Sequence, residues 1–229
     1  LKLKIPGRHN LMNAHAAISV GRVLGISDAV SIKALNDFNG TWRRMEYKGE
    51  INGAKIYDDY GHHPTEIKTT LDGARELLMA RRKNIPPGPL SKGGGRPQLW
   101  CVFQPHQYQR THLLFGKFVQ SFSAADKVIL LPIYSVAGRE KDSIKLKVNA
   151  EKLAEAIKEE KGNKENWVNK GNRGKNLGNS GNKEKKEEVI FLPDLKQAAE
   201  YLKNNLGRGD VCVIMGAGDV YKLTEGMFK

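Results

Sequence analysis

The sequence has no apolar run that approaches the about 20 residues needed to cross a membrane. Residues 1–7 also lack the apolar core of a secretion signal. Cysteine is scarce, with 2 residues in the chain. Cys101 and Cys212 both lie in apolar segments, so we interpret them as buried free thiols of a cytoplasmic protein. The first residue is Leu1 rather than methionine, from which we expect a piece of a longer protein.

A phosphate-binding loop of the form Gly-x-x-x-x-Gly-Lys-Ser/Thr is also missing, so the chain has no obvious main triphosphate site. Negative charge is in deficit, and the net charge is +13. Such a balance is typical of nucleic-acid binding. However, the excess is concentrated in segments 81–96 and 161–187, which do not regularly interleave aromatic residues with the charges. We therefore predict an anionic small substrate or solvated lysines rather than a nucleic acid.

The apolar periodicity predicts two parts. Residues 9–24 and 28–38 have the spacing of two helices. Beyond residue 45, strand-like runs (45–51, 54–59, 98–103, 127–133, 188–192, 210–215) alternate with helical ones (64–80, 110–124, 149–160, 194–205, 219–227). This alternation predicts an α/β fold, a mostly parallel doubly wound sheet with helices on both faces. Asn52-Gly53 predicts a hairpin that leads into the sheet.

Two segments interrupt this alternation. Residues 84–97 are too rich in proline and glycine for a helix or strand. Residues 161–183 are rich in asparagine, glycine and lysine, and such a composition buries too little apolar surface to offset its ordering entropy. We interpret the regions near 84–97 and 161–187 as surface insertions in the sheet domain.

The densest polar cluster is DDYGHHPTE, residues 58–66, directly after a predicted strand and before a predicted helix. Open α/β sheets bind ligands at the carboxyl ends of strands, so this position favours a functional site over a simple helix cap. A metal site is not predicted, because adjacent His62 and His63 point differently and a spaced third ligand is missing.

A second cluster, FQPHQYQRT, follows the next strand, and both clusters should converge on one rim of the sheet. Arg110 in it suits a carboxylate or phosphate, although a solvated arginine is the alternative. Near the start, Asn10 and Asn13 lie three apart on one helix face and suit an adenine edge, although capping is the usual role of such a pair. In GAGD, residues 216–219, a phosphate cradle and a tight turn are equally compatible with the glycines.

Taken in order, the segments GRHNLMNAHAA, RRMEY, DDYGHHPTE, FQPHQYQRT and GAGD resemble the Mur ligase family. The resemblance implies that residues 1–40 end the central ATP-binding domain and that 41–229 form the Rossmann-like C-terminal domain. It also implies ligation of L-alanine to UDP-N-acetylmuramate through an acyl phosphate, with ATP and Mg²⁺, the metal held mostly outside this chain. A murein-peptide recycling ligase and a non-enzymatic nucleotide-binding module are the alternatives.

The resemblance also implies roles for individual residues. Asn10, Asn13 and Asp59 would bind the nucleotide. The catalytic residues would be Arg44, which matches the family's interdomain arginine, together with His62 and His63. Tyr60, His62 and Arg110 would face the amino acid, with Arg110 on its carboxylate. One departure is Gln107, where the family commonly has arginine, and it leaves the amino-acid specificity open.

Overall fold

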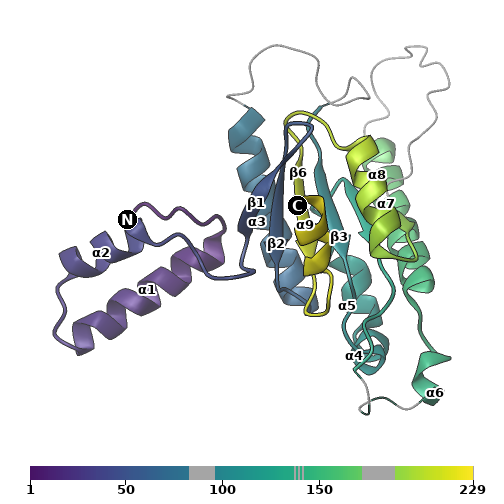
Figure 1. Ribbon diagram of the computed structural model, residues 1–229, viewed down its shortest axis with the longest axis horizontal. Helices are drawn as coiled ribbons and strands as arrows, with labels where there is room; N and C mark the ends of the chain where they lie inside the picture. The colour runs from purple at the N-terminus through teal and green to yellow at the C-terminus, as the bar shows by residue number, and fades with distance from the viewer. Residues whose placement is uncertain (83–95, 137, 139, 141, 172–188, 229) are drawn as a thin grey trace.

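The computed structural model describes residues 1–82, 96–136, 138, 140, 142–171 and 189–228, arranged as a helical pair beside a larger sheet domain (Figure 1). The pair consists of α1 (Arg8–Val23) and α2 (Asp28–Asp37). Both helices occur where their apolar spacing predicted them. Among the described helices, none is long and apolar enough to span a membrane.

Six strands form one sheet in the order β1-β2-β6-β3-β4-β5. Their bounds are β1 Glu46–Ile51, β2 Ala54–Asp59, β3 Leu99–Phe103, β4 Lys127–Leu130, β5 Val189–Phe191 and β6 Val211–Met215. All neighbouring pairs are parallel except β1 and β2. The predicted hairpin joins these two, and its turn residues Asn52 and Gly53 have φ of 53° and 79°, as a tight hairpin turn requires.

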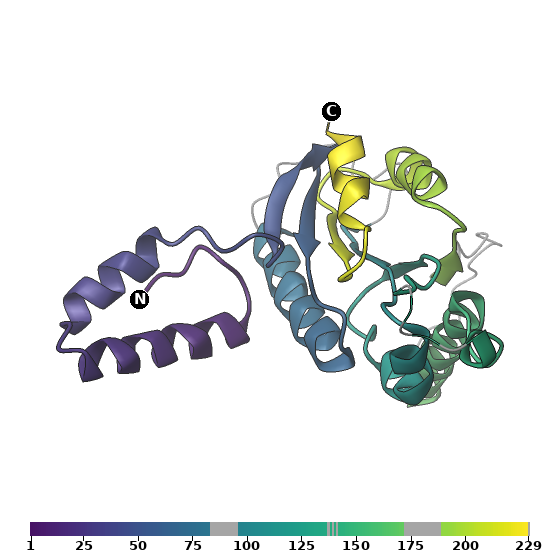
Figure 2. The same cartoon turned by 60° about the horizontal axis from the view of Figure 1, so that its bottom comes forward.

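Helices cover both faces of the sheet, which confirms the predicted doubly wound α/β fold (Figure 2). One face packs α3 (Pro64–Arg82), α5 (Phe115–Gln120) and α7 (Ala150–Gly171), while the other packs α8 (Leu195–Asn205) and α9 (Tyr221–Met227). Because side chains alternate along a strand, Cys101 and Phe103 reach the first core, whereas Trp100 and Val102 reach the second.

Three helices differ from the prediction. The single helix expected at 110–124 is two, α4 (Tyr108–Leu113) and α5. They break at Leu114, whose φ of −107° and ψ of 15° depart from helical values, and both Leu114 and Phe115 pack against the first core. A short α6 (Asp142–Lys145) was not predicted.

Helix α7 is the third difference, because it continues to Gly171 instead of ending at residue 160. Its Lys161 side chain donates to the carbonyl of Ala125 at 2.6 Å, which ties the extension to the sheet domain. The glycine that follows, Gly162, weakens a helix by only about 1 kcal/mol. Of the two expected insertions, 83–95 and 172–188 lie outside the described residues.

The helical pair meets the sheet domain at a close backbone contact. A Cβ atom added to Gly73 of α3 would lie 2.9 Å from the Cα atom of Gly7, just before α1. Gly73 therefore needs glycine, since the obstacle is backbone. Gly7 favours glycine for a different reason, because its φ is 100° and a Cβ there would lie 2.7 Å from the ring of His9.

We predict that Gly73→Ala destabilises the chain because the helical pair must move away from α3. The matched control is Gly116→Ala in α5, where an added Cβ meets nothing within 4 Å. Replacing glycine by alanine inside a helix should stabilise there by about 0.5–1 kcal/mol. Urea unfolding of both variants measures the difference. An equal gain in stability for the two would contradict the close contact.

Candidate functional site

Three strands end at the same level and bring the polar clusters together. In the register of the sheet, Met215 of β6 lies beside both Asp59 of β2 and Phe103 of β3. The next backbone bonds continue this alignment: the N–H of Gly216 donates to Asp59 at 3.1 Å, and that of Gln104 donates to Met215 at 3.0 Å. The two clusters therefore share one rim, as their positions after strands predicted.

The glycine turn after β6 is filled by protein atoms. The Gln104 side chain accepts from the N–H of Val220 at 3.1 Å and donates to Asp219 at 2.8 Å. A Cβ atom on Gly216 would lie 2.7 Å from the carbonyl oxygen of Gln104, and one on Gly218 would lie 2.5 Å from its Oε1. Of the two interpretations of GAGD, this packing favours a tight strand-to-helix turn.

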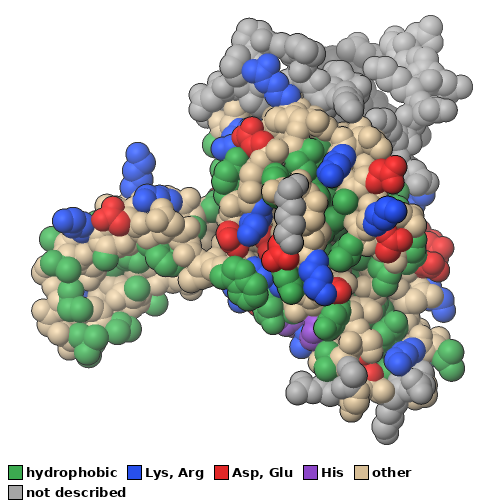
Figure 3. Space-filling model, in the orientation of Figure 1, with side chains coloured by type: hydrophobic (Ala, Val, Ile, Leu, Met, Phe, Trp, Pro, Cys, Tyr) green, Lys and Arg blue, Asp and Glu red, His purple; other side chains and the backbone are tan. Residues whose placement is uncertain are grey.

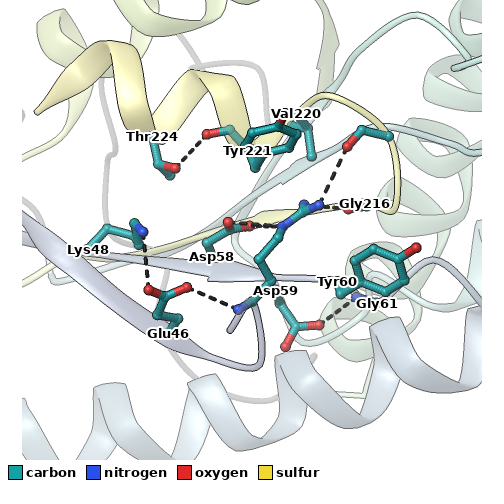
Figure 4. A network of polar contacts seen from close by, with 12 residues as sticks. Glu46, Lys48, Asp58, Asp59, Tyr60, Gly61, Gly216, Val220, Tyr221 and Thr224 are labelled. Carbon is teal, nitrogen blue, oxygen red and sulfur yellow. Dashed lines mark hydrogen bonds and ion pairs between the residues drawn. The ribbon is translucent and has the colours of Figure 1, made fainter. Parts of the chain in front are cut away.

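Asp58 and Asp59 end β2 and are compensated differently. Asp58 forms a buried ion pair with Arg43, whose Nε lies 3.0 Å from Oδ2 (Figure 4). The Asp59 carboxylate accepts backbone N–H groups instead, from Met45 at 2.9 Å and Gly61 at 2.8 Å. Burial raises the pKa of Asp59, and these two bonds oppose the rise. Each carboxylate is thus held in place by groups of its own.

A cavity of about 560 Å³ lies between the helical pair and the end of β2. Its walls are formed by Ile5, His9, Asn10, Asn13, Ala14, Ala17, Leu35, Phe38, Thr41, Arg44, Met45, Asp59 and Thr70. All three predicted nucleotide-binding residues and Arg44 are among them. The size is within the about 300–1,000 Å³ of small-molecule sites. Apolar walls with a few polar groups suit a flat heteroaromatic ring that carries hydrogen-bonding edges.

The linker between α2 and β1, residues 38–45, carries two arginines in different environments. Arg43 is 1% exposed and forms the ion pair with Asp58. The side chain of Arg44 is 52% exposed, lines the cavity, and lies 3.9 Å from a carboxylate oxygen of Glu66. Arg44, the arginine selected from the sequence, is therefore the one that lines the cavity.

Beside the cavity, aromatic rings form a row made of Tyr60, His62, His106 and Tyr134. Ring centroids are 5.5 Å apart for Tyr60 and His62, 5.9 Å for His62 and His106, and 5.4 Å for His106 and Tyr134. Burial lowers the pKa of His106, and nearby Arg110 and His62 lower it further. Tyr60, His62 and Arg110 were predicted to act together, and this row extends across their region.

Near the ring row, two buried polar atoms lack a hydrogen-bond partner among the described residues. They are Nδ1 of His106 and Nη1 of Arg110. Leaving such atoms unpaired costs about 1–3 kcal/mol each. A ligand that accepts from the guanidinium of Arg110 would recover part of that cost.

His63 lies next to the start of α3 and takes part in its cap. It precedes α3, and its Nδ1 accepts the N–H of Thr65 at 3.3 Å. Oε2 of Glu66 accepts the N–H groups of His62 and His63, each at 3.0 Å. These contacts form a helix cap. The catalytic role of His63 stays a prediction. Within the described residues, no group of three or more His, Cys, Asp or Glu is placed to hold a metal ion.

Three residues of this rim were not selected from the sequence. Gln104 closes the glycine turn, His106 completes the ring row, and Arg43 pairs with Asp58. His106 was detectable, because it lies in the second polar cluster, four residues before Arg110. A buried carboxylate requires a partner, so the Asp58-Asp59 pair could also have pointed to a second arginine.

The end of β2 lies at a largely apolar cavity with a few polar groups, and the carboxyl ends of parallel strands are where open α/β domains bind small ligands. The chain belongs to the Mur ligase family: the family model described as the Mur ligase glutamate ligase domain matches residues 43–86 and 89–218. That match includes the ring row and Asp59, and it begins at the buried arginine of the linker.

Curated relatives that are 34–39% identical to this chain are named UDP-N-acetylmuramate–L-alanine ligase. The UDP-N-acetylmuramate–L-alanine ligase of Acetivibrio thermocellus is 38% identical over 229 residues, which is 100% of this chain and 39% of that protein. The crystal structure of UDP-N-acetylmuramate–alanine ligase from Thermotoga maritima matches with a TM-score of 0.64 at 23% identity, covering 98% of this chain and 38% of that one. MurF ligase of the same organism, in complex with ADP, matches with a TM-score of 0.56 at 17% identity, covering 98% and 38%. The two structures show the fold, and the chain spans less than half the length of its relatives.

We predict that Arg43→Ala destabilises the chain by about 3–5 kcal/mol at pH 7, because Asp58 is left as an unpaired buried charge. Burial raises the pKa of Asp58, and Arg43 opposes the rise, so the variant should have a still higher pKa. Because the pKa of Asp58 is higher in the folded than in the unfolded state, stability is lost as pH rises from the unfolded pKa through the folded pKa.

The deficit of Arg43→Ala should therefore shrink on acidification, and adding Asp58→Asn should relieve most of it at pH 7. Urea unfolding of both variants between pH 4 and 8 measures these effects. A deficit that is independent of pH and of Asp58 would show that the ion pair does not determine it.

We also predict that Glu66→Ala costs about 0.5–2 kcal/mol at pH 7, the usual range for a helix cap. Burial acts to raise the pKa of Glu66, but the N–H groups of His62 and His63 outweigh it, so the pKa is lowered. Its stabilisation is thus present above the unfolded pKa and lost as pH falls through the folded one. Exposed Glu76 on the same helix provides the control, Glu76→Ala. A cost that is the same at pH 3 and pH 7 would refute the cap.

Proposed function

We propose that this chain is the C-terminal part of a cytoplasmic ATP-dependent ligase that joins L-alanine to UDP-N-acetylmuramate through an acyl phosphate. The observation that carries the proposal is the cavity in which Asn10, Asn13, Arg44 and Asp59 meet. Curated relatives 34–39% identical bear the name of that activity. Residues 1–40 would then be the end of the central ATP-binding domain, and 41–229 the C-terminal domain.

The nucleotide part of the proposal rests on the chemistry of the cavity walls. Asn10 and Asn13 bear amides that both donate and accept, as an adenine edge requires. The Nδ2 of Asn10 already donates to the carbonyl of Pro6 at 2.7 Å, which orients its side chain. Buried Asp59 suits a ribose hydroxyl, since a carboxylate has acceptor capacity beyond its two backbone bonds.

The surface of the helical pair supports the same assignment. Figure 3 shows apolar side chains gathered on this part of the molecule. Large exposed apolar residues there are Leu11, Met12, Val20, Val23, Leu24, Ile26 and Val30. Exposed apolar patches of this kind mark interaction surfaces. In the proposed protein, the rest of the ATP-binding domain would cover them.

For the amino acid, we propose the region of Tyr60, His62 and Arg110. Arg110 can bind a carboxylate through two parallel charge-assisted hydrogen bonds. Its buried Nη1 has no hydrogen-bond partner among the described residues and could donate to that carboxylate. The carbonyl of Tyr60 lies 3.1 Å from Nδ1 of His62 and orients the ring, and we propose that Nε2 faces the alanine. We propose that Arg44, His62 and His63 lie near the reacting groups, with Arg44 neutralising phosphoryl charge.

Mg²⁺ fits this chain poorly. Asp58 is engaged by Arg43, and Asp59 accepts two backbone N–H groups. In nucleotide-dependent enzymes Mg²⁺ is usually bound by one or two carboxylates together with substrate phosphates, and both of these carboxylates already have partners in the protein. We therefore propose that the metal of the reaction is bound by the part of the protein outside this chain.

A chimera tests the function. The chain should replace the matching 229 residues of the Acetivibrio thermocellus ligase, and phosphate release should be assayed with ATP, Mg²⁺ and UDP-N-acetylmuramate. We expect release that depends on L-alanine, and none from the chain alone. Arg110→Ala in the chimera should raise the alanine KM roughly 10- to 150-fold, from about 1.5–3 kcal/mol of lost charged hydrogen bonds.

Two outcomes would contradict the proposal. A folded chimera that accepts a murein peptide but not alanine would indicate the recycling ligase. A chimera in which Arg110→Ala leaves the alanine KM unchanged and raises the ATP KM would place this arginine at the phosphates.

A further inference from the structure

Arg43 is the most fully buried charged group in the wall behind the cavity. Its Nε lies 3.2 and 3.0 Å from the two carboxylate oxygens of Asp58. Nη2 donates to the carbonyl of Gly216 at 2.5 Å, and Nη1 to that of Gly218 at 3.5 Å. Figure 4 shows how Asp58 and the glycine turn approach this point from different strands.

Aromatic rings enclose the same guanidinium. Its central carbon lies 5.7, 5.3 and 5.2 Å from the ring centroids of Trp42, Tyr60 and Tyr221. Such cation–π contacts are strongest where water is excluded. The side chain therefore has one position available, and it joins the linker, β2 and the glycine turn.

The backbone around Arg43 is fixed in an unusual shape. Arg43 and Met45 have φ of 52° and 47°, in the left-handed region that L-residues seldom adopt. Backbone bonds hold this shape: the carbonyl of Arg43 accepts from Tyr60 at 2.7 Å, and the N–H of Met45 donates to Asp59 at 2.9 Å. Strain of this kind persists only where surrounding contacts determine it, and it concentrates at functional sites.

The residue between these two is Arg44. With Arg43 held inward and Met45 buried, the side chain of Arg44 points into the cavity. Its own contacts are weak, since Glu66 is 3.9 Å away and the Tyr60 ring centroid 5.9 Å. The direction of Arg44 is therefore set by the linker and not by partners of its side chain.

We propose that Arg43 is a positioning residue: its buried contacts hold the linker so that Arg44 presents its guanidinium to the phosphate groups of a nucleotide in the cavity. This inference rests on the proposed nucleotide-binding function. It assigns to Arg43 a role in ligand binding that its ion pair alone does not require, because a buried pair is often replaceable by uncharged residues without loss of stability.

The test compares adenosine with ADP, titrated into the 229-residue chain and followed by ligand-observed NMR. The quantity of interest is the ratio of the two dissociation constants, adenosine over ADP, which isolates the contribution of the phosphates. In the native chain we expect a ratio of roughly 10, the size of one charged hydrogen-bonding contact. Arg44→Ala should bring the ratio close to one.

Two variants probe Arg43. Arg43→Lys keeps the charge but removes the planar guanidinium that donates several hydrogen bonds at once. The double variant Arg43→Met with Asp58→Asn removes both charges, so that neither is left unpaired. Each should lower the ratio to that of Arg44→Ala while adenosine binding stays unchanged, and neither should lower it further when combined with Arg44→Ala. Arg22→Met is the control, since Arg22 makes a similar two-pronged contact with Asp28 at 2.8 and 2.7 Å on the exposed surface of the helical pair.

The outcomes separate the two proposals. If the native chain binds neither ligand, the nucleotide site is wrong, and this inference falls with it. If the ratio depends on Arg44 but a folded Arg43 variant retains the native ratio, only the positioning role is overturned. Failure of both Arg43 variants to give a cooperative thermal transition would also overturn it, because Arg43 would then serve the fold alone.

Discussion

The guanidinium of Arg43, paired with Asp58, joins the linker and β2 to the glycine turn, whose two contacting residues lie 173 and 175 positions further along the chain. Removing two charges from water costs several kcal/mol per ion, so such a pair persists only with many compensating contacts. Here the guanidinium also donates to two carbonyls of the glycine turn after β6. The side chain of Arg43 consequently holds the linker, β2 and that turn together. Arg44, Met45 and Asp59, which line the cavity, belong to the first two of these segments.

The two aspartates at the end of β2 have different partners and different positions relative to the cavity. Successive residues of a strand face opposite sides. Asp58 faces Arg43, while Asp59 faces the cavity and is held by backbone N–H groups. One carboxylate thus stabilises the wall, and the other remains near the space where a ligand would bind.

Local patterns in the sequence predicted most of the fold. Apolar spacing located α1 and α2, and Asn52-Gly53 located the hairpin, because these depend on neighbouring residues. The break at Leu114 and the length of α7 depend on packing with distant segments, such as the contact of Lys161 with Ala125. No local pattern carries that information.

For the candidate site, the resemblance to the Mur ligases selected Asn10, Asn13, Arg44 and Asp59. The four residues line one cavity, and their roles stay predictions. The inward position of Arg43 was not predictable from its neighbours, because it follows from the left-handed backbone of the linker and from contacts across 173 and 175 residues of chain. The capping contact of His63 likewise depends on how α3 begins.

A nucleotide should bind in the cavity lined by Asn10, Asn13, Arg44 and Asp59. A crystal structure of the chain grown with ADP tests this most directly. The adenine should lie against Asn10 and Asn13, with the ribose at Asp59 and the phosphates toward Arg44. A nucleotide bound instead at the glycine turn 216–218, or in the pocket between α8 and α9 that Ala199, Lys203 and Leu223 help to line, would contradict the assignment of the cavity.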